Sequence, residues 1–210
     1  YKLIFSHQNN NKLFNRGAIK NIGFLYIKQL YPEKYKDIIF IFNDIDTLPY
    51  KKNLLDYNID DNEIKHYYGY NFALGGIFAI KGKDFEKING FPNYWGYGYE
   101  DNIIYKRAID NKIIVNRKNF FIIGSKEILQ FYDGLKKRMD QNVIIKYTKK
   151  EKELDGLNTL NDIDFKYNNE TNMLDINNFT GLYSEKDIDI MLHDSRNGNN
   201  VKPMNKMFNR

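Results

Sequence analysis

Two adjacent carboxylates, Glu100 and Asp101, end a loop rich in glycine and aromatic residues. The apolar spacing of residues 102–109 predicts a helix, so both carboxylates would lie at its N-terminus, whose positive end favours their ionised form. Glycines let the loop backbone approach a ligand closely, and Trp95, the single tryptophan, offers a flat face to a sugar or a base. These residues indicate a binding site. Taken alone, the segment is about equally consistent with an ordinary connection, because similar loops often precede an acidic helix start.

A second pair of carboxylates, Asp44 and Asp46, follows the nearly continuous apolar run of residues 37–42. Such a run predicts a buried parallel strand, and open α/β sheets bind ligands at the carboxyl ends of their strands. Alternate residues of a strand share one face, so both side chains would point toward one hard divalent cation, which would bridge a diphosphate. Taken alone, most Asp-x-Asp sequences are turns or helix caps.

Arg16 is the third candidate, and it lies where the sequence predicts the start of a helix. A guanidinium at a strand-to-helix junction suits a charge-assisted contact with phosphate, and Phe14 offers a ring face to a base. The alternative is an ordinary surface arginine near a helix start.

The elements that position these side chains alternate between strands and helices. We predict helices over residues 19–30, 82–88, 102–109 and 135–154. We predict strands over residues 2–6, 37–42, 66–72, 75–81, 112–115 and 120–123, and antiparallel strands from residue 163 onward. The tail after Arg196 is polar and is predicted to be loose. This order predicts an α/β fold.

Composition narrows the class of protein. The 210 residues suffice for one sizeable domain, and 42% hydrophobic and 16% aromatic residues argue against disorder. The net charge of +5 comes from interspersed basic and acidic residues, which disfavours a nucleic-acid-binding domain and suits an anionic small molecule. The absence of cysteine excludes disulfides and thiolate metal sites. No apolar run reaches the length of a membrane span, and no signal-like segment is apparent, so the sequence predicts no membrane segment in this chain.

Taken together and in their order along the chain, the segments 14–24, 42–49 and 95–101 resemble the β-1,4-galactosyltransferase family (glycosyltransferase family 7). The resemblance covers about residues 1–110 and continues to residues 155–160, which look like the family's Asp-Gly-Leu-Asn segment. It implies a GT-A fold, a Rossmann-like mixed sheet flanked by helices. We expect residues 1–160 to form the catalytic domain, and residues 161–210 to add strands and a tail packed on the same domain.

The resemblance implies an inverting transfer of galactose or N-acetylgalactosamine from a UDP-sugar to a sugar or glycoprotein glycan, with Mn²⁺ or Mg²⁺ on the diphosphate. Asp101 would be the general base, because it need only accept the proton of the acceptor hydroxyl. Asp46 would bind the metal directly, assisted by Asp44. Carried over by position, the donor-binding residues would be Phe14, Arg16, Asp44, Ile45, Asp46, Ala73, Gly76 and Tyr97, and the acceptor-binding residues Trp95, Glu100 and Asp101.

The chain departs from the family pattern at several of these positions. Tyr97 replaces a tryptophan near the donor phosphate, Tyr99 replaces a glycine, and Asn102 replaces a third acidic residue. Ala73 replaces the aromatic residue beside the donor sugar. A smaller residue there makes room for a 2-N-acetyl group, so the donor is predicted to be UDP-GalNAc rather than UDP-galactose.

The family's metal-binding histidine, expected near residues 128–132, is missing. Gln130 or Tyr132 would substitute weakly, and His193 is a third candidate although it follows the Asp-Gly-Leu-Asn segment. The family's first strand, with its Pro-Phe-Arg motif, would precede Tyr1, which suggests a fragment or a divergent short form. These departures keep a second hypothesis open, namely a catalytically weak or inactive relative that binds nucleotide-sugar or glycan. Localisation also stays open, since the family usually resides in the Golgi lumen and a cytoplasmic or viral context is compatible with this chain.

Overall fold

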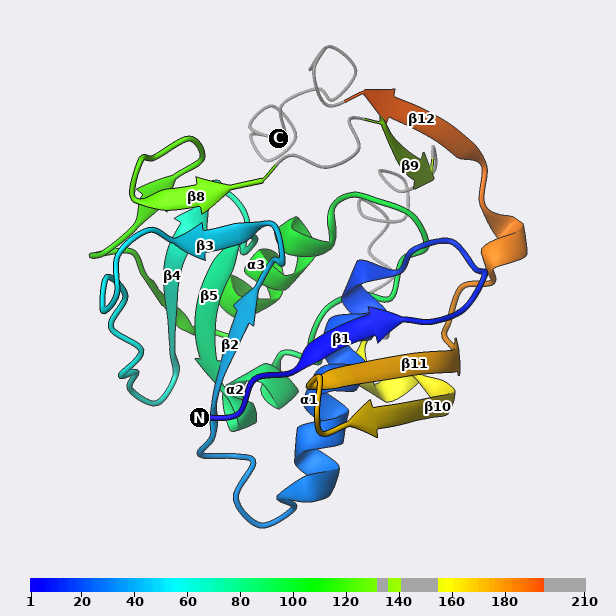
Figure 1. Cartoon of the computed structure of the whole chain (residues 1–210), viewed down its shortest axis with the longest axis horizontal. Helices are drawn as coiled ribbons and strands as arrows, with labels where there is room; N and C mark the ends of the chain where they lie inside the picture. The colour runs from blue at the N-terminus through cyan, green and yellow to red at the C-terminus, as the bar shows by residue number, and fades with distance from the viewer. Residues whose placement is uncertain (132–135, 141–154, 195–210) are drawn as a thin grey trace.

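A mixed central sheet forms the middle of the computed structural model, which describes residues 1–131, 136–140 and 155–194. Its strands, in spatial order, are β2 (Ile39–Asn43), β5 (Ile77–Lys81), β4 (Glu63–Gly69) and β6 (Ile114–Asn116), with β7 (Phe121–Ile122) also pairing with β4. The strands β2 and β4 run antiparallel to β5, whereas β6 and β7 run parallel to β4. The mixed α/β sheet predicted from the sequence is therefore present (Figure 1).

The strand before Asp44 corrects one prediction. β2 is an edge strand antiparallel to its neighbour, not a buried parallel strand. Phe42 packs on Phe78 and Phe85, with ring centroids 5.1 and 4.7 Å apart, while Ile41 on the opposite face is 42% exposed. The apolar run therefore hid an alternation in which one face packs in the core, while the opposite face is covered at Ile39 and open at Ile41.

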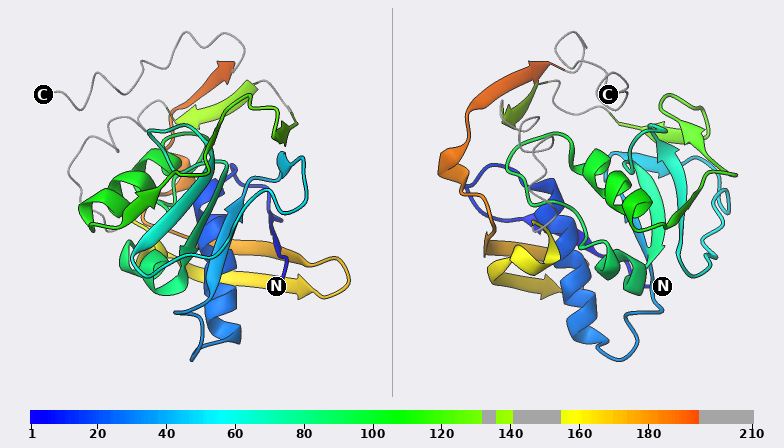
Figure 2. Two further views of the ribbon diagram at one scale, coloured as in Figure 1. Left: turned by 90° about the vertical axis from the view of Figure 1, so that its left-hand side faces the viewer. Right: turned by 180° about the vertical axis from the view of Figure 1, so that it is seen from behind.

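Two helices cover one face of this sheet: α2 (Gly82–Lys87) and α3 (Glu100–Asp110) (Figure 2). α3 buries Ile104 and Ala108 in the same apolar core as Phe78 and Phe85. Because α3 is fixed along its length by this core, its first residues have a defined position at the edge of the sheet.

The first helix, α1 (Arg16–Leu30), packs between the central sheet and a second sheet (Figure 1). The second sheet has the order β1 (Phe5–Gln8), β11 (Met173–Thr180) and β10 (Asn161–Asn168). On one side of α1, Phe24 contacts Phe85 at 4.9 Å between ring centroids; on the other, Ile22 packs in one core with Leu174 and Ile176. The antiparallel strands predicted after residue 163 are found in β10 and β11, and β1 joins β11 in parallel. The division of the chain at residue 160 stays a prediction.

Two short ladders complete the described structure. β3 (Thr47–Pro49) pairs with β8 (Ile128–Gln130), and β9 (Lys136–Asp140) pairs with β12 (Ile190–Asp194). Single 3-10 turns lie at η1 (Leu157–Thr159) and η2 (Glu185–Asp187).

The prediction of a helix over residues 135–154 is wrong for Lys136–Asp140, because these residues pair with β12 and bury Met139 against Tyr99. The rest of that predicted helix, and the tail after Arg196, lie outside the described residues. Within the described ranges, no helix has the length and apolarity needed to cross a membrane.

Candidate functional site

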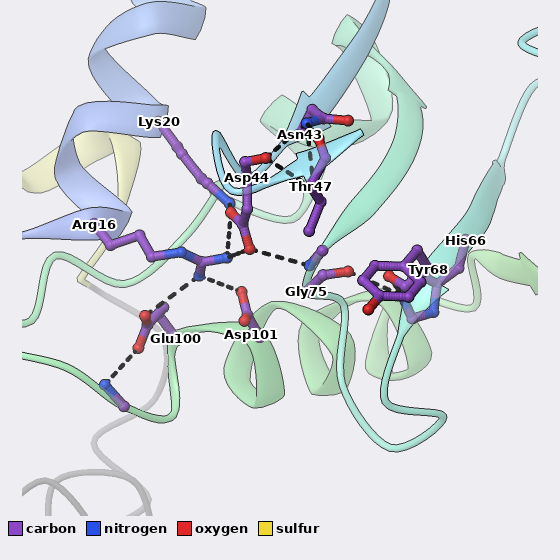
Figure 3. A network of polar contacts seen from close by, with 12 residues as sticks. Arg16, Lys20, Asn43, Asp44, Thr47, His66, Tyr68, Gly75, Glu100 and Asp101 are labelled. Atoms are coloured by element: carbon purple, nitrogen blue, oxygen red, sulfur yellow. Dashed lines mark hydrogen bonds and ion pairs between the residues drawn. The ribbon is translucent and has the colours of Figure 1, made fainter. Parts of the chain in front are cut away.

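Arg16 brings together three carboxylates from two segments, Asp44 after β2 and the adjacent Glu100 and Asp101 of α3 (Figure 3). Its Nη2 donates to both carboxylate oxygens of Asp44 at 2.7 Å, and its Nη1 donates to Asp101 Oδ1 at 2.6 Å and to Glu100 Oε1 at 3.3 Å. The Arg16 side chain is only 12% exposed. The three motifs singled out in the sequence therefore meet around one guanidinium, which the structure pairs with carboxylates.

The start of α1 fixes the position of Arg16. Asn15 caps the helix, and its side-chain oxygen accepts a hydrogen bond from the Ala18 N–H at 2.9 Å. The Asn15 amide donates to the Asn93 carbonyl at 3.0 Å, and Asn21, nearly two turns further along, donates to the Phe91 carbonyl at 2.7 Å. These buried amides tie α1 to the loop that precedes Glu100.

The Asp-Gly-Leu-Asn segment, residues 155–158, also fixes the loop that precedes Glu100. Asp155 accepts hydrogen bonds from the Asn93 backbone and side chain at 2.7 and 3.1 Å, and the Gly156 carbonyl accepts a third at 2.8 Å. Arg107 of α3 donates to the Asp155 carbonyl. The segment thus supports the site structurally without entering the group of carboxylates.

Asp44 and Asp46 lie in the tight connection between β2 and β3, not along a strand. The prediction that strand alternation turns both carboxylates to one face is therefore wrong. The Thr47 hydroxyl donates to the Asp44 carbonyl at 2.8 Å, and the Phe131 N–H donates to the Asp46 carbonyl at 2.7 Å. Asp44 also accepts the Gly76 N–H at 3.3 Å. The turn consequently directs Asp44 to Arg16 and fastens Asp46 to the end of β8.

Glu100 and Asp101 occupy the first turn of α3, as predicted. Tyr99 enters the helix in the left-handed conformation with φ of 65°, and the Gly98 N–H donates to Glu100 Oε2 at 2.9 Å. A Cβ at Gly75 would lie 2.5 Å from Asp101 Oδ2, so glycine is needed for the close approach of this turn to the carboxylate.

The carboxylates around Arg16 have pKa values shifted in opposite directions, down for Asp44 and up for Glu100. Burial alone would raise the pKa of Asp44, but the charges of Arg16 and Lys20 outweigh burial and hold its pKa well below the ordinary value. Burial raises the pKa of Glu100, and the nearby charge of Asp101 adds to this effect while Arg16 opposes it. Asp44 therefore stays ionised, and Glu100 is the carboxyl group that protonates more readily.

His66 supports the Gly75 turn from the side away from Arg16 (Figure 3). Arg117 Nε can only donate, so His66 Nδ1 accepts its hydrogen bond at 3.0 Å and Nε2 carries the proton. Nε2 donates to the carbonyl oxygens of Gly75 and Tyr68, both at 3.0 Å. Burial, followed by the charge of Arg117, lowers the pKa of His66 to about 4.

We expect His66 to make the protein less stable in acid. Between its ordinary pKa of 6.5 and its folded-state pKa of about 4, the unfolded chain binds more protons, so the free energy of unfolding decreases as the pH falls through this window. Protonation of His66 lowers the free energy of unfolding by up to about 3 kcal/mol over this window. The test is to measure the free energy of unfolding in urea for wild type and His66→Gln, both at neutral pH and at a pH near the folded-state pKa of about 4. An equally steep pH dependence in both proteins would contradict it.

The remaining predicted donor and acceptor residues differ in their surroundings. Ile45 is 85% exposed, and Phe14 and Tyr97 are also exposed, which leaves their side chains accessible to a ligand. Ala73 is buried, and Gly76 adopts a positive φ of 68° in the turn before β5. Although 47% of Tyr97 is exposed, desolvation of its hydroxyl and the charge of Glu100 raise its pKa to about 12, so the hydroxyl stays protonated.

Trp95 is not brought to the carboxylates. It is 6% exposed, stacks on Phe179 with ring centroids 5.1 Å apart, and donates its indole N–H to the Tyr183 carbonyl at 2.8 Å. Both its face and its polar group are therefore used in the core, where it holds the loop.

Sequence reasoning missed Lys20, whose Nζ lies 2.8 Å from Asp44 Oδ1. The signal was its spacing from Arg16: residues i and i+4 of a helix share one face.

The candidate metal ligands are few. The described ranges contain no group of three histidine, cysteine, aspartate or glutamate side chains able to hold a metal ion. Gln130 pairs with Thr47 across the β3–β8 ladder, which places it near Asp46, and its Oε1 accepts the Tyr68 hydroxyl at 2.6 Å. A carboxylate and an amide oxygen suit a hard cation whose remaining ligands come from a substrate. Tyr132 lies outside the described residues, and the backbone of His193 lies in β12.

Comparisons with known proteins show similarity to galactosyltransferases. Residues 57–132 match the family model described as the N-terminal domain of galactosyltransferase. Mouse β-1,4-galactosyltransferase 1 is 28% identical over 76% of this chain and 42% of its own length. The xylosylprotein 4-β-galactosyltransferase of Caenorhabditis elegans is 28% identical over 67% of this chain and 50% of its own length. The chain thus spans about half the length of these relatives.

The fold is also similar to solved structures. The catalytic domain of Drosophila β-1,4-galactosyltransferase 7, solved with xylobiose, superposes with a TM-score of 0.66 at 19% identity, covering 89% of this chain and 83% of that one. A mutant of that enzyme, solved with manganese, UDP-Gal and xylobiose, gives a TM-score of 0.64 with the same identity and coverage. The predicted GT-A fold is confirmed, and the chain is similar to β-1,4-galactosyltransferases in both sequence and fold.

Proposed function

We propose that this protein transfers a hexose from a UDP-sugar to a sugar acceptor with inversion at the anomeric carbon. The observation that carries the proposal is the convergence of Asp44 and Asp101 on Arg16, since a guanidinium suited to a phosphate group lies between the two motifs that the proposed reaction needs. The similarity to galactosyltransferases supports it, including a neighbour solved with UDP-Gal and xylobiose.

Asp101 acts as the general base in this proposal. Its carboxylate takes the proton of the acceptor hydroxyl while the hydroxyl oxygen forms the bond to the anomeric carbon. The bond from that carbon to the diphosphate oxygen breaks at the same time, and UDP leaves with the bonding electrons. Because the base and the leaving group lie on opposite faces of the sugar, the configuration inverts. Arg16 contacts the donor phosphates as UDP binds.

Asp46 and Gln130 would hold a divalent cation, with Mn²⁺ as the first choice because a structural neighbour contains manganese. Cations of this kind commonly bind through one or two carboxylates and complete their coordination with substrate phosphates. The ion would neutralise the charge that develops on the departing diphosphate.

The donor sugar is the finer part of the proposal. Ala73 contributes only a methyl group at the turn that leads to Gly76, which favours a donor with a bulky 2-N-acetyl group, UDP-GalNAc, over UDP-galactose. The exposed ring of Tyr97 contacts the donor, and Glu100 and Asp101 at the start of α3 contact the acceptor, a free sugar or the glycan of a glycoprotein.

A catalytically weak relative that binds nucleotide-sugar or glycan is the second candidate. The lack of a three-residue metal-binding group in the described ranges favours it. Titration of Mn²⁺ and UDP, combined with transfer assays on UDP-galactose and UDP-GalNAc, separates the two candidates. We expect metal-dependent transfer, faster from UDP-GalNAc. Nucleotide binding without transfer or donor hydrolysis would support the binding protein, and clearly faster transfer from UDP-galactose would refute the donor assignment.

A further inference from the structure

Lys20 is a second cation beside Asp44, and it lies partly buried on the same face of α1 as Arg16 (Figure 3). Its side chain is 12% exposed, and its Nζ lies 2.8 Å from Asp44 Oδ1 and 5.1 Å from the centroid of the Phe91 ring. A lysine in such a place loses much of its hydration, so its contact with Asp44 is part of how the site is built.

Asp44 is held from two elements at once. Arg16 and Lys20 reach it from α1, and the Gly76 N–H reaches it from the turn before β5 at 3.3 Å. These donors fix both carboxylate oxygens. The orientation of the β2–β3 turn, which also carries Asp46, is thereby fixed.

Arg16 cannot keep all three of its carboxylate partners when it also binds a phosphate group of a substrate. It faces Asp44, Glu100 and Asp101, and its positive charge is the one that these carboxylates share. If Arg16 turned to a phosphate group and Asp44 had no other cation, a largely buried carboxylate would lose its compensation, which is costly. Lys20 removes this obstacle because it pairs with Asp44 independently of Arg16.

We propose that Lys20 is a positioning residue that keeps Asp44 paired and oriented while Arg16 exchanges this carboxylate for the diphosphate of the nucleotide donor. The inference rests on the proposed function, in which Arg16 contacts the donor phosphates. Lys20 itself need not touch the donor or the reacting atoms.

UDP binding in the presence of Mn²⁺, measured by calorimetry, tests this role. In Lys20→Met, Arg16 is the cation left on Asp44, and we expect the Kd for UDP to increase about tenfold, the equivalent of one charge-assisted hydrogen bond. Lys20→Arg keeps a cation and should restore most of the affinity. Lys28→Met is the matched control, because Lys28 lies on the same helix and pairs with Glu86 away from the site. Equal UDP affinity in Lys20→Met and Lys28→Met would overturn the inference.

A double-mutant cycle separates positioning from direct contact. If Lys20 acts through Asp44, adding Lys20→Met to Asp44→Asn should leave the Kd for UDP as it is in Asp44→Asn alone. Additive losses would show that Lys20 binds the donor itself and would overturn the positioning role. Absence of UDP binding in wild type would overturn the proposed function together with this inference, whereas UDP binding and transfer by wild type with an unaffected Lys20→Met would overturn the inference alone.

Discussion

Replacing Asp101 by asparagine is expected to lower kcat by about 10²- to 10⁴-fold, the usual contribution of a general base. Asparagine has nearly the same shape and keeps an oxygen for the hydrogen bond from Arg16, but its neutral amide does not accept the proton of the acceptor hydroxyl. The Kd for UDP should change little, because the proposed phosphate contacts come from Arg16 and the metal. Sugar transfer measured beside UDP calorimetry checks both expectations.

Asp110→Asn provides the control for this experiment. Asp110 lies in the last turn of the same helix, is exposed, and pairs with Lys106 at the surface. Its replacement should leave transfer unchanged. Wild-type rates in Asp101→Asn would remove the proposed base, and an equal loss in Asp110→Asn would point to a general effect on α3.

Replacing Arg16 by methionine is expected to reduce the free energy of unfolding by about 3–5 kcal/mol, the usual cost of breaking a buried ion pair. Asp44, Glu100 and Asp101 would then lose their shared cation, and Lys20 would remain paired with Asp44. UDP binding should be lost as well. Urea unfolding at neutral pH gives the stability, and calorimetry gives the affinity.

Two further variants sharpen the Arg16 experiment. Arg16→Lys keeps the charge but not the planar guanidinium that reaches several carboxylates at once, so its stability should fall between wild type and Arg16→Met. Arg138→Met removes an exposed arginine and should cost little. Equal stability of Arg16→Met and Arg138→Met would mean that Arg16 is an ordinary surface residue.

The sequence allowed the main members of the site to be predicted because each had a local signal. Glu100 and Asp101 followed a glycine-aromatic loop, Asp44 ended an apolar run, and Arg16 preceded a periodic helix. Local signals do not show which side chains pair across the fold. The direct contacts between Arg16 and three carboxylates therefore emerged only from the packing of α1 against the start of α3 and the β2–β3 turn.

Other features depend on long-range packing that local patterns do not encode. Trp95 was expected at the acceptor, but Phe179, far along the chain, covers its face. The basic run at residues 136–140 looked helical because pairing with β12 is invisible in its own sequence. The run 37–42 looked fully buried because its exposed position holds Ile41, an apolar residue at the edge of the sheet.

The configuration of the transferred sugar is the most direct test of the account. The wild-type protein, Mn²⁺, a UDP-α-linked hexose donor and a sugar acceptor would be incubated, and the anomeric proton of the product read by NMR. A base positioned across the anomeric carbon from the departing UDP requires a β-linked product. An α-linked product, formed with retention, would contradict the role given to Asp101 and the arrangement built around it.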